Sequence, residues 1–184
     1  MPGIGIGWEQ MMNGTNPSQS TNGATLSAST ALTDVTPIDY EVPAYSVYQG
    51  QVWTTTASGI ITTAASTPGN LTLALYYGGT GGTIVASTGA LALYTSATNA
   101  VWQLQIYIRV HSVSSASVAA VYPFGTVTGI TAAAGTNMMP ATAASGGPVN
   151  ITTNANAAWA LYATFTSGTT NTLTCYQFFV ESLN

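Results

Sequence analysis

Residues able to carry acid–base chemistry are few in this 184-residue chain, and the closest pair is Asp39 and Glu41. Two carboxylates at this spacing could share one face of an extended segment, as general acid and base in glycoside hydrolysis require. Together with Asp34 they could also offer oxygen ligands to calcium. They stand between Pro37 and Pro43 in a segment that resembles a loop, and they match no calcium-loop spacing. We therefore expect neither a catalytic pair nor a metal site here.

The remaining reactive groups stand alone. His111 is the single histidine, and no aspartate is placed to orient it, so a Ser-His-Asp triad is not supported. Cys175 is the single cysteine, which excludes an intramolecular disulfide, and we expect it to be a buried apolar residue. The glycines of GGTGG at 78–82 lack the lysine and the following helix of a phosphate-binding loop. We expect no enzyme activity and no cofactor.

Charge is scarce throughout the chain. Only 3% of the residues are charged, against about 25% in ordinary soluble domains. Lysine is absent and Arg109 is the only guanidinium, so nucleic acid and anionic membranes are not expected partners. No run of 18 apolar residues appears, and the opening MPGIGIGWEQ does not resemble a secretion signal.

The elements that position these residues are predicted to be β-strands. Residues 24–33 and 46–57 are rich in β-formers, and 71–77 alternates before GGTGG turns the chain into TIVAST. The clearest strand is 101–113, where Trp102, Leu104, Ile106, Ile108 and Val110 are expected inside and Tyr107, Arg109 and His111 outside.

Further strands are expected to complete one domain. SVAAVYPF at 117–124 is predicted to return beside 101–113, and the next 25 residues form a long loop or two weak strands. Strands at 157–166 and 171–182 are expected to be joined by a hairpin loop. The pattern predicts an all-β fold: an antiparallel β-sandwich of jelly-roll type with about eight strands, spanning 24–184.

Residues 1–23 are predicted to form an extended, glycine-rich arm. Its apolar side chains are unusual for a free tail, and it is either a loosely packed terminus or an arm that becomes ordered on a partner. Our candidates for partner contact are the apolar arm residues and the methionine pair of the long loop: Ile4, Ile6, Trp8, Met11, Met12, Met138 and Met139.

Exposed sheet edges present a problem for a chain without lysine. Soluble proteins guard such edges with charges, so closure of the sheet or a neighbouring chain is expected to cover them. Interface cores are likewise poor in charge and rich in aromatic residues. We therefore expect a homo-oligomer rather than a monomer kept soluble by its hydroxyl groups. The candidate interface residues are Tyr76, Tyr107, Arg109 and His111.

Three segments resemble a known family. TPGNLTLALYYGGTGGTIVASTGALAL, TNAVWQLQIYIRVHSV and TLTCYQFFVESLN are similar to small virion proteins of tailed bacteriophages with actinobacterial hosts, over residues 45–184. The resemblance implies a jelly-roll domain, often a trimer, on the outside of the phage head, with the major capsid protein as partner and no catalytic residues. It leads us to expect a capsid decoration protein. The alternatives are a minor tail or fibre-associated protein and a carbohydrate-binding module that uses Tyr76 and Tyr107.

Overall fold

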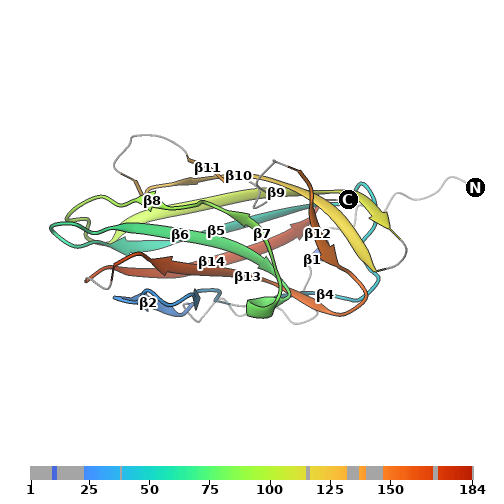
Figure 1. Cartoon of the computed structure of the whole chain (residues 1–184), viewed down its shortest axis with the longest axis horizontal. Helices are drawn as coiled ribbons and strands as arrows, with labels where there is room; N and C mark the ends of the chain where they lie inside the picture. The colour runs from blue at the N-terminus through green and yellow to red at the C-terminus, as the bar shows by residue number, and fades with distance from the viewer. Residues whose placement is uncertain are drawn as a thin grey trace, which may run out of the picture.

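The computed structural model describes residues 10–11, 23–37, 39–114, 117–131, 137–139, 147–167 and 170–183, and for 10–11 and 137–139 it describes the backbone alone. Two antiparallel sheets pack face to face in this part of the chain, and their long strands run along the long axis of the molecule (Figure 1). No helix in the described ranges has the length and apolar character needed to cross a membrane. The all-β, antiparallel architecture expected from the sequence is confirmed.

The larger sheet has eight strands, with the path β1-β14-β5-β9-β10-β11 and two further strands beside β14 and β10. Its strands are β1 (Gln10–Met11), β2 (Thr25–Ser27), β5 (Val52–Thr62), β9 (Ala100–Ser114), β10 (Val118–Thr128), β11 (Asn137–Met139), β12 (Val149–Thr152) and β14 (Thr172–Ser182).

The smaller sheet has six strands, with the path β3-β13-β6-β7 and β4 and β8 alongside. Its strands are β3 (Thr33–Asp34), β4 (Tyr40–Val42), β6 (Asn70–Tyr77), β7 (Thr83–Ser87), β8 (Leu91–Ala92) and β13 (Ala157–Phe165). A short 3-10 turn, η1 (Gly79–Gly81), joins β6 to β7. Gly78 and Gly79 have φ angles of 95° and 69°, so the tight glycine turn is confirmed.

The core lies between the inner faces of the two sheets and is dense in aromatic side chains. Trp53 of the larger sheet meets Trp159 of the smaller sheet edge to face, with ring centroids 5.5 Å apart. Tyr77 packs on Trp159 at 4.9 Å, and burial raises the pKa of Tyr77 to about 12, which keeps its phenol neutral. Such edge-to-face pairs stabilise a core beyond the area that they bury.

Period-two alternation located the long strands well. All five residues predicted on the inner face of β9 are fully buried, and β10 returns beside β9 as expected. In β6 and β13 the buried inward positions also alternate; they are Leu71, Leu73, Leu75, Tyr77, Trp159, Leu161, Ala163 and Phe165.

The expected hairpin between the last two strands is wrong. β13 pairs with β6 in the smaller sheet, whereas β14 pairs with β5 in the larger one, so the connection crosses from sheet to sheet. The buried Asn171 anchors the crossing: its side chain accepts a hydrogen bond from the Ala64 N–H at 2.9 Å and donates to the Pro68 carbonyl at 2.6 Å. Short loops can also link strands of different sheets, and the composition of the loop does not distinguish this connection from a hairpin.

Two early strands are shorter than, or displaced from, the predicted ranges. Within 24–33 the chain leaves the ladder at Ala28, which has a φ of 45° and donates its N–H to the Asn171 carbonyl at 2.9 Å. The strand expected at 46–57 begins at Val52, because Gly50 turns the chain with a φ of 90°. β-rich composition therefore marked these segments without fixing their ends.

Short strands of the same chain pair with parts of the long edge strands of both sheets. β14 is flanked by β1 and β2, β10 by β11 and β12, and β13 by β3 and β4. Very short edge strands are one of the ways by which proteins avoid edge-to-edge association. Along β14, β10 and β13 the chain itself therefore covers part of the edge that closure or a neighbouring chain was expected to cover. β7 is the remaining edge strand, and in the described residues only β6 pairs with it.

We predict that Gly59→Ala destabilises the fold by about 1–3 kcal/mol, as overpacking does. A β-carbon on Gly59 would lie 1.9 Å from the Thr174 carbonyl oxygen, so β14 would have to move away from β5. Urea unfolding measures the loss. Gly81→Ala is the matched control, because a β-carbon there meets nothing within 4 Å. Equal stability of the two variants would contradict this packing.

Candidate interaction surface on the eight-stranded sheet

The outer face of the larger sheet, which points away from the smaller sheet, carries side chains in regular rows across β14, β5, β9 and β10. Strand register places Glu181, Thr54, Tyr107 and Phe124 in one row. The row on one side contains Phe179, Thr56, Gln105 and Thr126, and the row on the other contains Val52, Arg109 and Tyr122. Hydroxyl, amide and aromatic groups therefore fill this face.

Three aromatic side chains gather where β9 and β10 meet. Tyr107 and Phe124 are directly opposite, with exposed fractions of 43% and 59%, and Tyr122 is 41% exposed in the next row. Tyr107 accepts a hydrogen bond from Gln105 Nε2 at 3.1 Å, and His111 meets the ring of Tyr122 edge to face at 5.5 Å. We call Tyr107, Tyr122 and Phe124 the aromatic patch. Exposed rings held by a rigid sheet are suited to contact with another surface.

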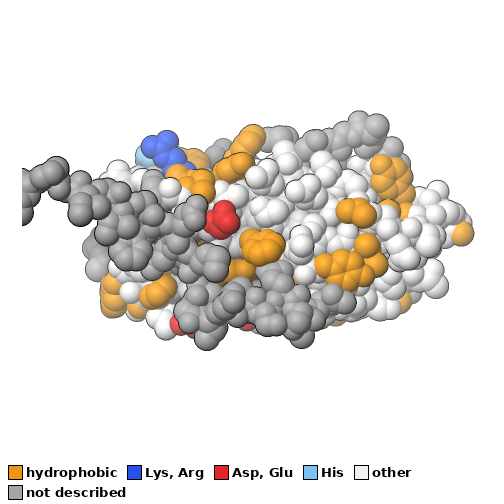
Figure 2. Space-filling view, turned by 180° about the vertical axis from the view of Figure 1, so that it is seen from behind, with side chains coloured by type: hydrophobic (Ala, Val, Ile, Leu, Met, Phe, Trp, Pro, Cys, Tyr) orange, Lys and Arg blue, Asp and Glu red, His pale blue; other side chains and the backbone are white. Residues whose placement is uncertain are grey.

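Among the described residues of the four long strands, the charged side chains on this face are Arg109 on β9 and Glu181 on β14. Arg109 and Glu181 lie on opposite sides of β5 and in different rows. Figure 2 shows hydrophobic side chains as separate islands among uncharged polar ones, with basic and histidine side chains together at one corner. Such a surface can bury apolar and hydrogen-bonding groups without removing many ions from water.

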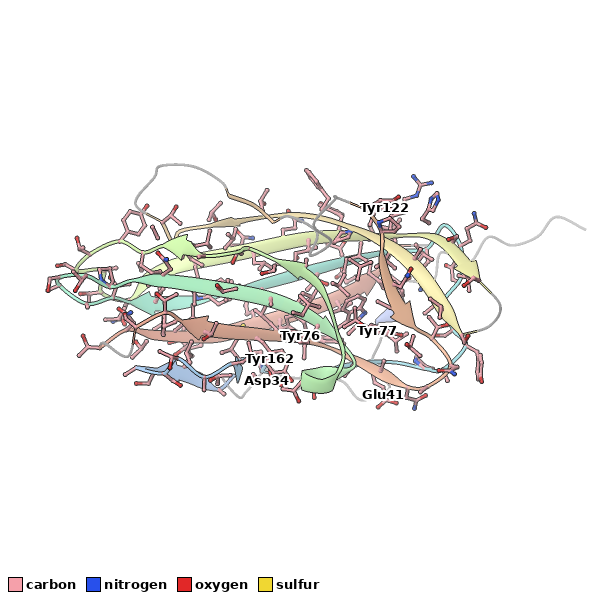
Figure 3. The ribbon with its side chains drawn as sticks, viewed as in Figure 1. Asp34, Glu41, Tyr76, Tyr77, Tyr122 and Tyr162 are labelled. Carbon is pink, nitrogen blue, oxygen red and sulfur yellow. The ribbon has the colours of Figure 1, made fainter. Side chains whose placement is uncertain are left out.

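Tyr107, Arg109 and His111 are exposed on β9 as predicted, but Tyr76 does not join them. Tyr76 lies on the outer face of the smaller sheet, across the sandwich, and only 7% of its side chain is exposed. It packs on Tyr162 with ring centroids 4.7 Å apart, beside Ala74 and Ala160. Figure 3 shows Tyr76 and Tyr162 together and Tyr122 well apart from them. The expectation that Tyr76 is an exposed aromatic is therefore wrong, because a second apolar cluster encloses it.

The two acids of the proline-flanked segment, Asp39 and Glu41, interact with different groups. The carboxylate that acts on Asp39 is that of Asp34: partial exclusion of water and then the charge of Asp34 raise the pKa of Asp39. Glu41 instead accepts a hydrogen bond from the Asn156 amide. In the described ranges no group of three or more acids, histidines or cysteines is placed to hold a metal ion.

Asp34 connects this segment to the tyrosine cluster. Its Oδ1 accepts the Thr36 N–H at 2.9 Å, and its carboxylate accepts a hydrogen bond from the Tyr162 hydroxyl. Burial raises the pKa of Tyr162, and the charge of Asp34 and the hydrogen bond to Asp34 raise it further. A hydrogen bond from Thr80 lowers the pKa and partly offsets these effects. Asp34 therefore helps to hold the edge segment against the sheet.

Cys175 is buried, as expected. Its thiol contacts the Gln177 carbonyl at 3.2 Å, and burial raises the pKa of the thiol to about 12. The nucleophilic thiolate is therefore scarce at neutral pH.

The predicted contact residues Ile4, Ile6, Trp8 and Met12 lie outside the described residues. The backbone of Met11 pairs with Glu181, and the Met138 and Met139 backbones pair with β10, but their side chains lie outside the described part. β11 lies within the predicted long loop, and β12 begins where that loop ends.

Sequence reasoning missed Tyr122, Phe124 and Phe179 as surface residues. The signal was present, because alternation in 117–124 places Tyr122 and Phe124 on the same side of their strand. The sequence does not reveal the strand register. That register places Phe124 opposite Tyr107, and it places Phe179 on β14, two strands away from Tyr107.

Comparisons with known proteins identify no relative: no family model, no curated protein and no solved structure matches this chain.

We predict that Asp34→Asn lowers the pKa of Asp39, because it removes the neighbouring negative charge and keeps an oxygen acceptor at position 34. The folded pKa of Asp39 is above its ordinary value of 3.8, so this group's contribution to stability declines as pH rises through the folded pKa. Carboxyl chemical shifts followed by NMR report the change. An unchanged Asp39 titration would show that Asp34 does not act on it.

Proposed function

We propose that this chain is a non-enzymatic structural protein of a bacteriophage particle: a capsid decoration protein that binds the outer surface of the head as a homotrimer. It would be made in the host cytoplasm and located on the virion. The observation that carries the proposal is the outer face of the larger sheet, a broad and nearly uncharged surface with the aromatic patch exposed.

The outer face of the larger sheet supports self-association better than the sheet edges do. Short strands of the same chain flank most of the long edges, so a neighbouring chain is not needed to cover them. In contrast, Tyr107, Phe124 and Phe179 are large exposed rings on one rigid face. Interfaces are enriched in such residues and depleted in charge at their centre.

We also propose that the sandwich is of jelly-roll type. The first long strand, β5, pairs with the last, β14, and the second long strand, β6, pairs with the last but one, β13. This nesting of early with late strands is what wrapping a long two-stranded ribbon around a core produces.

The major capsid protein and other copies of this chain are the proposed partners. Many weak contacts repeated over a symmetric particle give firm attachment without high affinity at any single site. Nucleic acid and membranes are not among the proposed partners, because one arginine offers little to phosphate groups.

The aromatic patch favours one further candidate, a carbohydrate-binding module. Tyr107 and Phe124 are flanked by Gln105 and Thr126, and rings with nearby amides and hydroxyls can stack on and hydrogen-bond to sugars. Binding to a glycan array that is lost in Phe124→Ala would favour this candidate, whereas binding to particles without any glycan signal would favour the structural role.

We predict that the purified protein co-sediments with isolated phage heads that lack it. Deletion of residues 2–22 is expected to abolish this attachment, because the apolar arm is the proposed capsid contact. The deletion also removes β1, but β2 still pairs with β14, so the free protein is expected to stay folded. Circular dichroism of the truncated protein is the control for folding. Wild-type occupancy by the truncated protein would refute the arm's role, and labelling of the tail alone on whole virions would replace the head assignment by a tail assignment.

A further inference from the structure

We infer that the outer face of the larger sheet binds a second copy of this chain, with the β14 side of one copy lying against the β9 side of the other. The inference rests on the proposed self-association and specifies its surface. On β14 this face presents Gln177, Phe179 and Glu181, all exposed; on β9 it presents Gln105, Tyr107 and Arg109, also exposed.

The two sides are complementary in order. Glu181 lies in the row of Thr54, and Arg109 lies one row away, in the row of Val52. Phe179 lies in the row of Thr56, and Tyr107 lies one row further in the same direction, in the row of Thr54. Likewise Gln177 lies in the row of Ser58, and Gln105 lies one row further, in the row of Thr56. Each exposed residue of β14 on this face therefore has a complementary residue on β9 one row further along: base for acid, ring for ring and amide for amide.

Register separates Glu181 from Arg109 within one copy. β5 lies between their strands, so the two backbones are roughly 10 Å apart across the sheet, and they also differ by one row. Arg109 shares its row with Val52 and Tyr122, and neither can neutralise it. Complementary charges on two sides of one face are therefore positioned to meet in a pair of molecules.

The strand between the two sides permits close approach. On its outer face β5 presents Thr54, Thr56 and Ser58, which are short side chains and are buried or half-buried. A rotation axis running along β5 would bring the β14 side of one copy to the β9 side of the next, whether two or three copies surround it, with equal rows facing each other. Glu181 of one copy would then lie one row, about 7 Å along the strand, from Arg109 of the next, which is within reach of the long arginine side chain.

The test is charge reversal, with self-association measured by sedimentation velocity across a dilution series. Glu181→Arg and Arg109→Glu should each weaken self-association by at least about tenfold, because each places like charges together. The double variant Glu181→Arg/Arg109→Glu should restore it, because the pair is rebuilt with its signs exchanged. Glu41→Arg is the control for Glu181→Arg. It makes the same change of charge on β4 of the other sheet and should leave self-association unchanged.

The outcomes separate this inference from the proposed function. A wild-type protein that stays monomeric at every concentration, or a double variant no better than the single ones, would overturn the inference. Attachment to heads is a separate measurement and stands or fails independently. Mixing the two single variants then distinguishes a dimer from a trimer. In a mixed dimer both contacts join opposite charges, so association is restored. In a mixed ring of three, two copies of the same variant are neighbours, so one contact joins like charges.

Discussion

The structure depends on satisfying the backbone of two long-stranded sheets in a chain that has almost no charge. Unpaired N–H and C=O groups along an edge strand attract other strands, and lysine or glutamate usually prevents this. Here two short segments lie along each of the outermost long strands β14, β10 and β13. Because each segment pairs over only two to four residues, the new edge is too short to be a good template. Backbone pairing within the chain thus replaces electrostatic protection.

This arrangement shifts the surface available for binding from the edges to the faces. On the outer face of the smaller sheet, Tyr76 and Tyr162 are buried and pack with Ala74 and Ala160. The larger sheet leaves its outer face open, with the aromatic patch and Phe179 exposed among threonines and glutamines. The two outer faces therefore differ in how far their aromatic side chains are exposed, which is why we propose the face of the larger sheet as the binding surface.

Local patterns predicted the interior of the fold and much less of its connectivity. Strict alternation in β9 predicted which side chains are buried, because a shift of the strand by one residue would expose all five of its inward apolar side chains. The crossing between β13 and β14 was missed, because which sheet a strand joins depends on pairing over long sequence distances. Ala28 and Gly50 ended strands where composition still favoured them, since hydrogen bonds and backbone turns are set by tertiary contacts.

The candidate surface was predictable in part for the same reason. Tyr107, Arg109 and His111 follow from the alternation of a single strand, whereas Phe124 and Phe179 join them only through the register of neighbouring strands. Tyr76 was assigned correctly to the side of β6 that faces away from the core, but alternation says nothing about what packs on that side. Burial on an outer face comes from segments far away in sequence, such as the one that contains Asp34.

The central claim is that this protein binds through the open face of its larger sheet and not through its strand edges. Hydroxyl-radical labelling of side chains and amide hydrogen exchange, both compared between dilute and assembled protein, test it directly. The account predicts that Tyr107, Phe124 and Phe179 lose labelling on assembly while amide protection along β7 and the short edge strands stays the same. New protection of edge amides with unchanged labelling of the three rings would contradict it.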